Sequence, residues 1–86
     1  MTTWRKLIQE HIGWSGEPIR ACTLTDAELD VEFDAESFGR VCGKAFTAWT
    51  DSWVIFPSVY DGWEGVASAP RNPCDTATGH VGGGTP

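Results

Sequence analysis

The sequence predicts an α+β domain, in which an N-terminal helix and a second short acidic helix pack on a three- or four-stranded antiparallel sheet. Three observations predict it: helical spacing of apolar residues at the N-terminus, an acidic segment with helix-start signals, and β-type segments separated by turn dipeptides. The chain has 86 residues, 41% of them hydrophobic, which suits one domain with a thin core. Residues 1–73 are expected to form this domain, and residues 74–86 a flexible Gly-rich C-terminal tail.

The first helix is expected to begin after Thr2 or Thr3, either of which can cap it, and to run to about His11 or Ile12. Gly13 then ends the helix. The apolar residues that recur at helical spacing are Trp4, Leu7, Ile8 and Ile12. After a turn-rich link, the mixed segment at residues 19–24 suits an edge strand.

The segment TDAELDVEFDAE, residues 25–36, places an acidic residue at every second position, an alternation typical of a strand with one acidic face. Helix-start signals oppose that interpretation. Thr25 and Glu28 match a capping box, and Leu24 and Leu29 occupy the positions of a hydrophobic staple. Acidic residues are also poor strand formers, although in a helix their i, i+4 repulsions cost about 0.2–0.5 kcal/mol per pair. A short helix is favoured, and the strand remains the alternative.

The choice between helix and strand affects the expected partner. In a strand, the carboxylates would recur every ~6.6 Å on one face, a spacing comparable to that of DNA phosphates. Such a row could imitate DNA in a basic nucleic-acid channel. A helix would instead scatter the six acids around most of a cylinder, leaving a dense acidic patch.

Residues 45–69 predict two β-hairpins. AFTAWT, WVIFPSVY and WEGVASA read as strands, and the dipeptides Asp-Ser and Asp-Gly separate them. Asp-Gly suits a type I′ turn, which needs a positive φ at both central positions. Because two-residue turns fix the register, Tyr60 is expected opposite Trp63 and Ala48 opposite Ile55.

This register predicts two apolar sheet faces. One would carry Trp49, Val54, Phe56, Tyr60 and Trp63, and the other Phe46, Trp53, Ile55, Val59 and Val66. One amphipathic helix does not cover both faces. Either the acidic segment covers the second, or part of it is an interaction surface or a homodimer interface. Pro57 disturbs the pattern, because a central strand rarely tolerates proline except at a bulge.

The charge balance indicates the kind of partner. Twelve acids against six dispersed bases give a net charge of −6, which argues against direct nucleic-acid binding and suits a basic protein surface. The polar N-terminus does not read as a signal peptide, and no apolar run approaches the ~18 residues of a membrane span. We therefore expect no membrane association and a soluble, cytoplasmic protein, in which the three cysteines are reduced thiols.

No motif in the sequence indicates a reaction or a cofactor. The candidate metal ligands, which are Cys22, Cys42, Cys74, His11 and His80, lack the paired spacing of a zinc site. No nucleophile elbow is present, and the tail glycines lack the strand-to-helix context of a phosphate loop. We therefore predict no catalytic residue, no metal site and no cofactor.

The pieces FTAWT, YDG and PRNPC within residues 46–74, with TLTDAELDVEFD upstream, resemble a family of small, mostly uncharacterised proteins from phages and prophages. The resemblance spans about half of the chain and implies no functional residue. It implies a context, since short acidic phage proteins often bind and block a host protein. In size and charge the chain also resembles anti-CRISPR proteins as a class.

The sequence thus predicts a small non-enzymatic protein that inhibits a host protein, such as a component of a CRISPR-Cas defence system, by occupying a basic surface. The residues expected to contact this partner are Asp26, Glu28, Asp30, Glu32, Asp34, Glu36, Trp53 and Trp63. The alternative is a structural or regulatory module that self-associates, as a homodimer for example, and has no inhibitory role.

Overall fold

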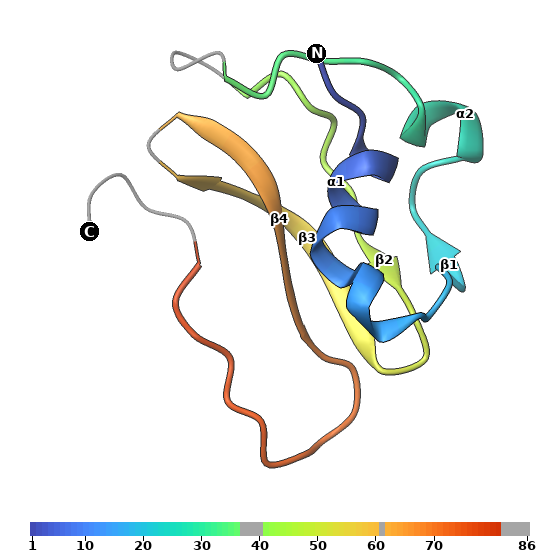
Figure 1. Ribbon diagram of the computed structural model, residues 1–86, viewed down its shortest axis with the longest axis vertical. Coiled ribbons are helices and arrows are strands. Elements are labelled where there is room, and N and C mark those ends of the chain that lie inside the picture. Colours follow the sequence, from blue (N-terminus) through green and yellow to red (C-terminus); the bar gives the residue numbers. More distant parts are fainter. Residues whose placement is uncertain (37–40, 61, 82–86) are drawn as a thin grey trace.

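A computed structural model describes residues 1–36, 41–60 and 62–81 (Figure 1). The helical elements are α1 (Trp4–Ile12), the 3₁₀ turn η1 (Gly13–Ser15) and α2 (Asp26–Leu29). The strands are β1 (Ala21–Cys22), β2 (Ala48–Trp49), β3 (Trp53–Tyr60) and β4 (Trp63–Pro70). They form an antiparallel sheet in the order β1-β2-β3-β4. The predicted α+β fold is confirmed, with four strands.

α1 begins where the Thr3 hydroxyl accepts the Lys6 N–H at 3.2 Å, so the cap is the second of the two candidate threonines. The helix ends at Gly13, as expected. Its buried residues are Trp4, Ile8 and Ile12, which join the hydrophobic core. Figure 1 shows α1 in front of the sheet, so one sheet face is covered by this helix.

The register of the long hairpin matches the sequence-based expectation. Tyr60 lies opposite Trp63 across the β3–β4 turn, and Ala48 lies opposite Ile55 between β2 and β3. Gly62 has a φ of 81°, the positive value that a primed turn requires and that glycine adopts without strain. Asp61, the other central residue of the turn, lies outside the described residues.

Pro57 is accommodated without a bulge. The β3–β4 register is continuous through it, with Pro57 opposite Val66. β2 pairs only with Val54 and Ile55, so at Pro57 β3 has a strand neighbour on one side alone. Proline has no N–H to donate. It is tolerated at position 57 because this position lies beyond the end of β2, where no strand hydrogen bond needs that donor.

The two sheet faces are unequal. The face beneath α1 contains the buried residues Phe46, Ala48 and Ile55. The other, called here the open face, carries Trp49, Val54, Phe56, Tyr60 and Trp63, which range from partly to half exposed. No described helix lies over the open face, so the acidic segment does not cover it.

The acidic helix exists but is a single turn, Asp26–Leu29, and the expectation that it scatters all six acids around a cylinder is wrong. The chain leaves the helix so that Phe33 can pair with Thr2, with backbone hydrogen bonds of 2.9 and 3.0 Å in both directions. This pairing buries Phe33 against the ring of Trp4, 4.6 Å between centroids. The free energy gained by burying the Phe33 side chain outweighs the small gain from continuing α2, in which the carboxylates would repel one another.

Residues 71–81 are exposed and contain no helix or strand. They run beside β4 (Figure 1) and, together with β4 and His11, line a cavity of about 360 Å³. The last part of the expected tail, residues 82–86, lies outside the described residues. Its flexibility and the boundary at residue 73 stay predictions.

Candidate interaction surface

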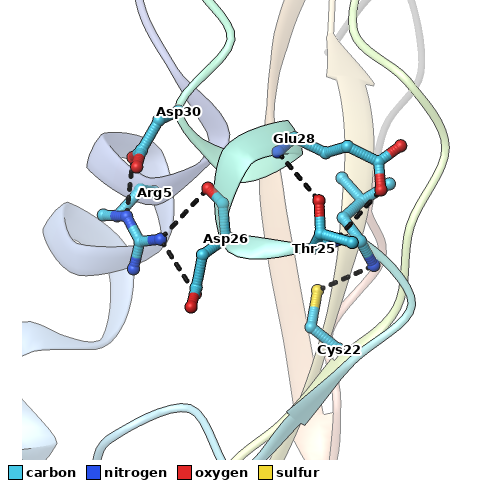
Figure 2. A network of polar contacts seen from close by, with 7 residues as sticks. Arg5, Cys22, Thr25, Asp26, Glu28 and Asp30 are labelled. Carbon is cyan, nitrogen blue, oxygen red and sulfur yellow. Dashed lines mark hydrogen bonds and ion pairs between the residues drawn. The ribbon is translucent and has the colours of Figure 1, made fainter.

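The capping box that the sequence predicts is present at the start of α2. The Thr25 hydroxyl accepts the Glu28 N–H at 3.2 Å, and the Glu28 carboxylate accepts the Thr25 N–H at 3.0 Å. Leu24 and Leu29, the two staple residues, are both buried in the core. These contacts fix where the acidic segment starts (Figure 2).

Arg5 of α1 holds two of the acids. Its guanidinium donates to Asp30 at 2.7 Å and to Asp26 at 3.1 Å, as Figure 2 shows. The hydrogen bonds that these two carboxylates accept, first Asp30 and then Asp26, raise the pKa of Arg5 above its usual value. Both acids are exposed, so this network fastens α2 to α1 without burying charge.

Glu28 is the third acid with a cation. The Lys44 ammonium donates to its carboxylate from the loop that precedes β2. That contact, followed by the Thr25 N–H, lowers the pKa of Glu28 to about 2. Three of the six predicted contact acids therefore have a structural task within the chain.

The remaining three acids, Glu32, Asp34 and Glu36, have no cationic partner among residues 1–36, 41–60 and 62–81. They are exposed and alternate with the buried Phe33 and the partly buried Ala35. The period-two pattern of the sequence is thus realised here, after the helix rather than in place of it. The six carboxylates of residues 25–36 and the two cations paired with them, Arg5 and Lys44, together carry a net charge of −4.

The structure brings Trp63 to the end of this acidic surface. The Glu64 N–H donates to the Ala35 carbonyl at 2.7 Å. This hydrogen bond joins the start of β4 to the residue that lies between Asp34 and Glu36 in the sequence. Trp63 is 51% exposed and its cross-strand neighbour Tyr60 is 47% exposed. The hairpin tip, with its two half-exposed aromatic side chains, is therefore hydrogen-bonded through the backbone to the acidic segment.

Trp53, the other predicted anchor, is not part of this group. It stands at the opposite end of β3, on the face that α1 covers, roughly 23 Å from Tyr60 along the strand. Its ring meets Trp14 edge to face, with centroids 5.8 Å apart. Trp53 is only partly exposed, and its contact with Trp14 gives it a packing role.

Glu64 is a positioning residue that sequence reasoning did not single out. Its carboxylate, 7% exposed, accepts the N–H groups of Cys42 and Gly43, both at 2.8 Å. This anchors the loop that leads to Lys44. The alternation of side chains along β4 could have identified it, because residue 64 is on the same inward-facing side as Val66. Carboxylates are rare on such a side unless they are hydrogen-bonded.

The cavities do not indicate a reaction. The larger, about 610 Å³, lies between α1, β1 and α2. Its charged rim is already engaged, with Arg5 bound to Asp26 and Arg20 bound to Asp51. Its deepest residues, Ile8 and Leu29, belong to the core.

His11 and Ser68 hydrogen-bond at 2.9 Å and line the smaller cavity. A serine nucleophile also needs a group that orients the histidine and donors for an oxyanion, and the described residues place no acid on His11. The pair therefore joins α1 to β4. Among the described residues, no three His, Cys, Asp or Glu side chains are grouped as metal ligands, and no helix is long and apolar enough to cross a membrane.

Comparison of the chain with models of known protein families, with curated proteins and with solved structures found no match.

Proposed function

We propose that the chain is a non-enzymatic binding protein that engages a basic surface of another protein through its acidic segment. The observation that carries this proposal is the set of three exposed carboxylates, Glu32, Asp34 and Glu36, without a cation among the described residues. The resemblance to small phage proteins adds the context of host inhibition in the cytoplasm, with a nucleic-acid-handling defence system such as CRISPR-Cas as the intended target.

The six acids differ in whether a cation of the same chain already binds them, and this difference supports the proposal. Asp26, Glu28 and Asp30 are engaged by Arg5 and Lys44, so a partner would have to compete for them. The other three can meet a partner's Lys or Arg at no such cost. Exposed charges of this kind mainly speed association and set partner choice, and salt weakens their effect.

A charge-matched pair of variants tests the proposal. Glu32→Gln/Glu36→Gln removes two of the available carboxylates and leaves Asp34, whose side chain accepts the Glu36 N–H at 3.0 Å. Glu10→Gln/Asp75→Asn makes the same change of net charge at exposed positions outside the segment. In pull-downs from host lysate at low and high salt, we expect the first variant to bind its partner about 3- to 10-fold more weakly at low salt. Equal binding by both variants would contradict the role of the acidic segment.

A second candidate function, self-association without inhibition, is favoured by one observation. The open face carries no charged residue on β2, β3 or β4, so contact between two open faces would bury apolar area without burying a charge. Sedimentation velocity distinguishes the two functions. A dimer that persists at high salt supports self-association through the open face, because burial of apolar area is insensitive to screening.

A further inference from the structure

We propose that the outer edge of β4 takes up an extended, uncharged segment of a partner protein, which adds a fifth strand to the sheet. The site, called here the edge site, consists of the main-chain N–H and C=O groups of Val66 and Ser68 and the cavity beside them. In this mode of peptide recognition, main-chain hydrogen bonds supply much of the affinity. The inference goes beyond the proposed function, because it does not depend on the acidic segment.

The register determines which groups of β4 face away from the sheet. β4 is the last strand in the sheet order, so β3 is its one strand neighbour. Along an antiparallel pair, hydrogen-bonded and non-hydrogen-bonded positions alternate, and the two-residue turn makes Tyr60 and Trp63 a hydrogen-bonded pair. Every second residue of β4 after Trp63 therefore bonds to β3. The residues between them direct their N–H and C=O groups outward, and these residues are Glu64, Val66 and Ser68.

Two hydrogen bonds agree with this alternation. The Glu64 N–H, which belongs to the outward series, donates to the Ala35 carbonyl at 2.7 Å. The Arg71 N–H, which belongs to the series that faces β3, donates to the Ser52 carbonyl just before β3 at 2.8 Å. The outward direction of the residues between these two points follows from the same alternation.

The edge of β4 is closed at its two ends and open between them. Ala35 occupies the N–H of Glu64 at one end, and Pro70 has no N–H to offer at the other. The main-chain groups of Val66 and Ser68 have no hydrogen-bond partner among residues 1–36, 41–60 and 62–81. Unpaired N–H and C=O groups on an edge strand are a template for another strand.

A cavity of about 360 Å³ runs along this open stretch. Residues on both sides of β4 line it, with Val66 and Ser68 on the side of α1 and Ala67 on the open face. Residues 76–81 form its outer wall, and Figure 1 shows this part of the chain beside β4. The volume lies within the range of roughly 300–1,000 Å³ that is typical of ligand pockets.

A single strand of a partner fits the edge site better than a second copy of the chain. Two copies could bring their β4 strands to the pairing distance of about 4.8 Å only if residues 76–81 of both moved aside. One strand can enter between β4 and this wall. The wall itself makes no main-chain hydrogen bond to β4 within the described part of the chain.

The lining of the cavity indicates the chemistry of the strand. No Asp, Glu, Lys or Arg among the described residues lines it. An uncharged segment therefore loses no solvated charge on entry. β-branched residues suit it, because they favour the extended conformation and pack on a pleated surface.

The first measurement is amide hydrogen exchange of the full chain, followed by ¹⁵N-correlated NMR. We expect the N–H groups of Val66 and Ser68 to exchange at least about 10-fold faster than those of Ala67 and Ala69, which bond to β3. Equally slow exchange would show that the chain's own residues 76–81 close the edge. A dependence of the Val66 and Ser68 signals on protein concentration would show that a second copy does so. Either result would overturn the proposal.

The second measurement adds a probe, an acetylated peptide of alternating threonine and valine with one terminal lysine for solubility. The control peptide has the same side chains but N-methylated main-chain nitrogens, so it has no donors for strand pairing. We expect the probe to shift the Val66 and Ser68 signals and to slow their exchange, and the control peptide to do neither. Absence of these changes, or equal changes with both peptides, would contradict strand addition.

Variants identify the main-chain donor. Val66→Pro removes the outward N–H without removing a bond to β3, and proline is tolerated at such edge positions. It should weaken the probe about 3- to 10-fold, whereas Val66→Thr, which keeps the N–H, should bind as the wild type does. Equal affinities of these two variants would exclude the edge site. If Val66→Pro does not fold, the comparison of the two peptides on the wild-type chain decides.

This test can fail independently of the proposed function. Glu32→Gln/Glu36→Gln should leave binding of the probe unchanged, because neither carboxylate lines the cavity. Loss of lysate binding in that variant together with failure of the probe would sink the edge site alone. The opposite pair of results would sink the role of the acidic segment alone.

Discussion

Gly43 lies in the loop before β2, in tight contact with the Trp4 side chain of α1. A Cβ there would lie 2.4 Å from Trp4 Cζ2 and 3.0 Å from the Glu64 carboxylate. The Trp4 indole is itself fixed, since its Nε1–H donates to the Lys44 carbonyl at 2.9 Å. The tight contact leaves room for a hydrogen atom alone.

Gly43→Ala should therefore destabilise the fold by about 1–3 kcal/mol, the usual cost of overpacking a core. Gly79→Ala is the control, because a Cβ at Gly79 meets nothing within 4 Å. Urea denaturation followed by tryptophan fluorescence gives both values. Equal midpoints for the two variants would show that Trp4 can move aside.

Glu64 is the second residue whose single side chain organises a loop. Glu64→Gln keeps the shape but offers one acceptor oxygen to two N–H donors, those of Cys42 and Gly43. We expect a loss of about 1–3 kcal/mol, the cost of leaving a buried donor unsatisfied. The exposed Glu10→Gln should stay within about 0.5 kcal/mol of the wild type in the same denaturation experiment.

At the scale of elements, α2 depends on ionisation of Glu28. The folded-state pKa, about 2, lies below the ordinary value of 4.5. Ionised Glu28 therefore contributes stability above pH 4.5, and this contribution is lost as the pH falls toward 2.

The prediction is that stability falls less between neutral and acidic pH in Glu28→Gln than in the wild type. Glu17, whose pKa is also lowered by hydrogen bonds from Thr50 and Ser52, leaves the same residual acid sensitivity in both proteins. Urea midpoints at neutral pH and at about pH 3 give the comparison. An identical fall in the two proteins would mean that the contact with Lys44 is not populated in solution.

The same element shows what the sequence can and cannot predict. The start of α2 was predictable, because Thr25 and Glu28 are three residues apart and their contacts are local. Its end was not, because it depends on Thr2 pairing with Phe33, which lie 31 positions apart. The hairpin register was also predictable from local sequence, because a two-residue turn determines it.

The candidate surface follows the same rule. Its exposed acids and Trp63 were named from composition and alternation. The sequence gives no sign that Arg5 and Lys44 engage three of those acids, because these contacts join residues 16 to 25 positions apart. For the same reason the sequence did not reveal that the start of β4 is hydrogen-bonded to Ala35, while Trp53 lies at the far end of β3.

At the scale of the whole molecule, charge and apolar surface are segregated. The acidic segment together with its paired Arg5 and Lys44 carries a net charge of −4 at one side, and the open face of β2, β3 and β4 carries none. The two surfaces meet at the hairpin tip, where the Glu64 N–H reaches Ala35. A partner that touches both would bury apolar area next to its ionic contacts, where screening by water is reduced.

The order of the elements along the chain has a consequence for synthesis on the ribosome. The apolar side chains of α1 emerge first, but the strands they pack against, β3 and β4, emerge last. The contacts between α1 and β4 therefore form only after about 50 residues of further translation, although Trp4 can meet Phe33 and Phe46 before that. The β3–β4 hairpin, whose contacts are local, is the natural nucleus on which the waiting helix then docks. The nascent chain thus exposes an uncovered apolar stripe that a chaperone can recognise.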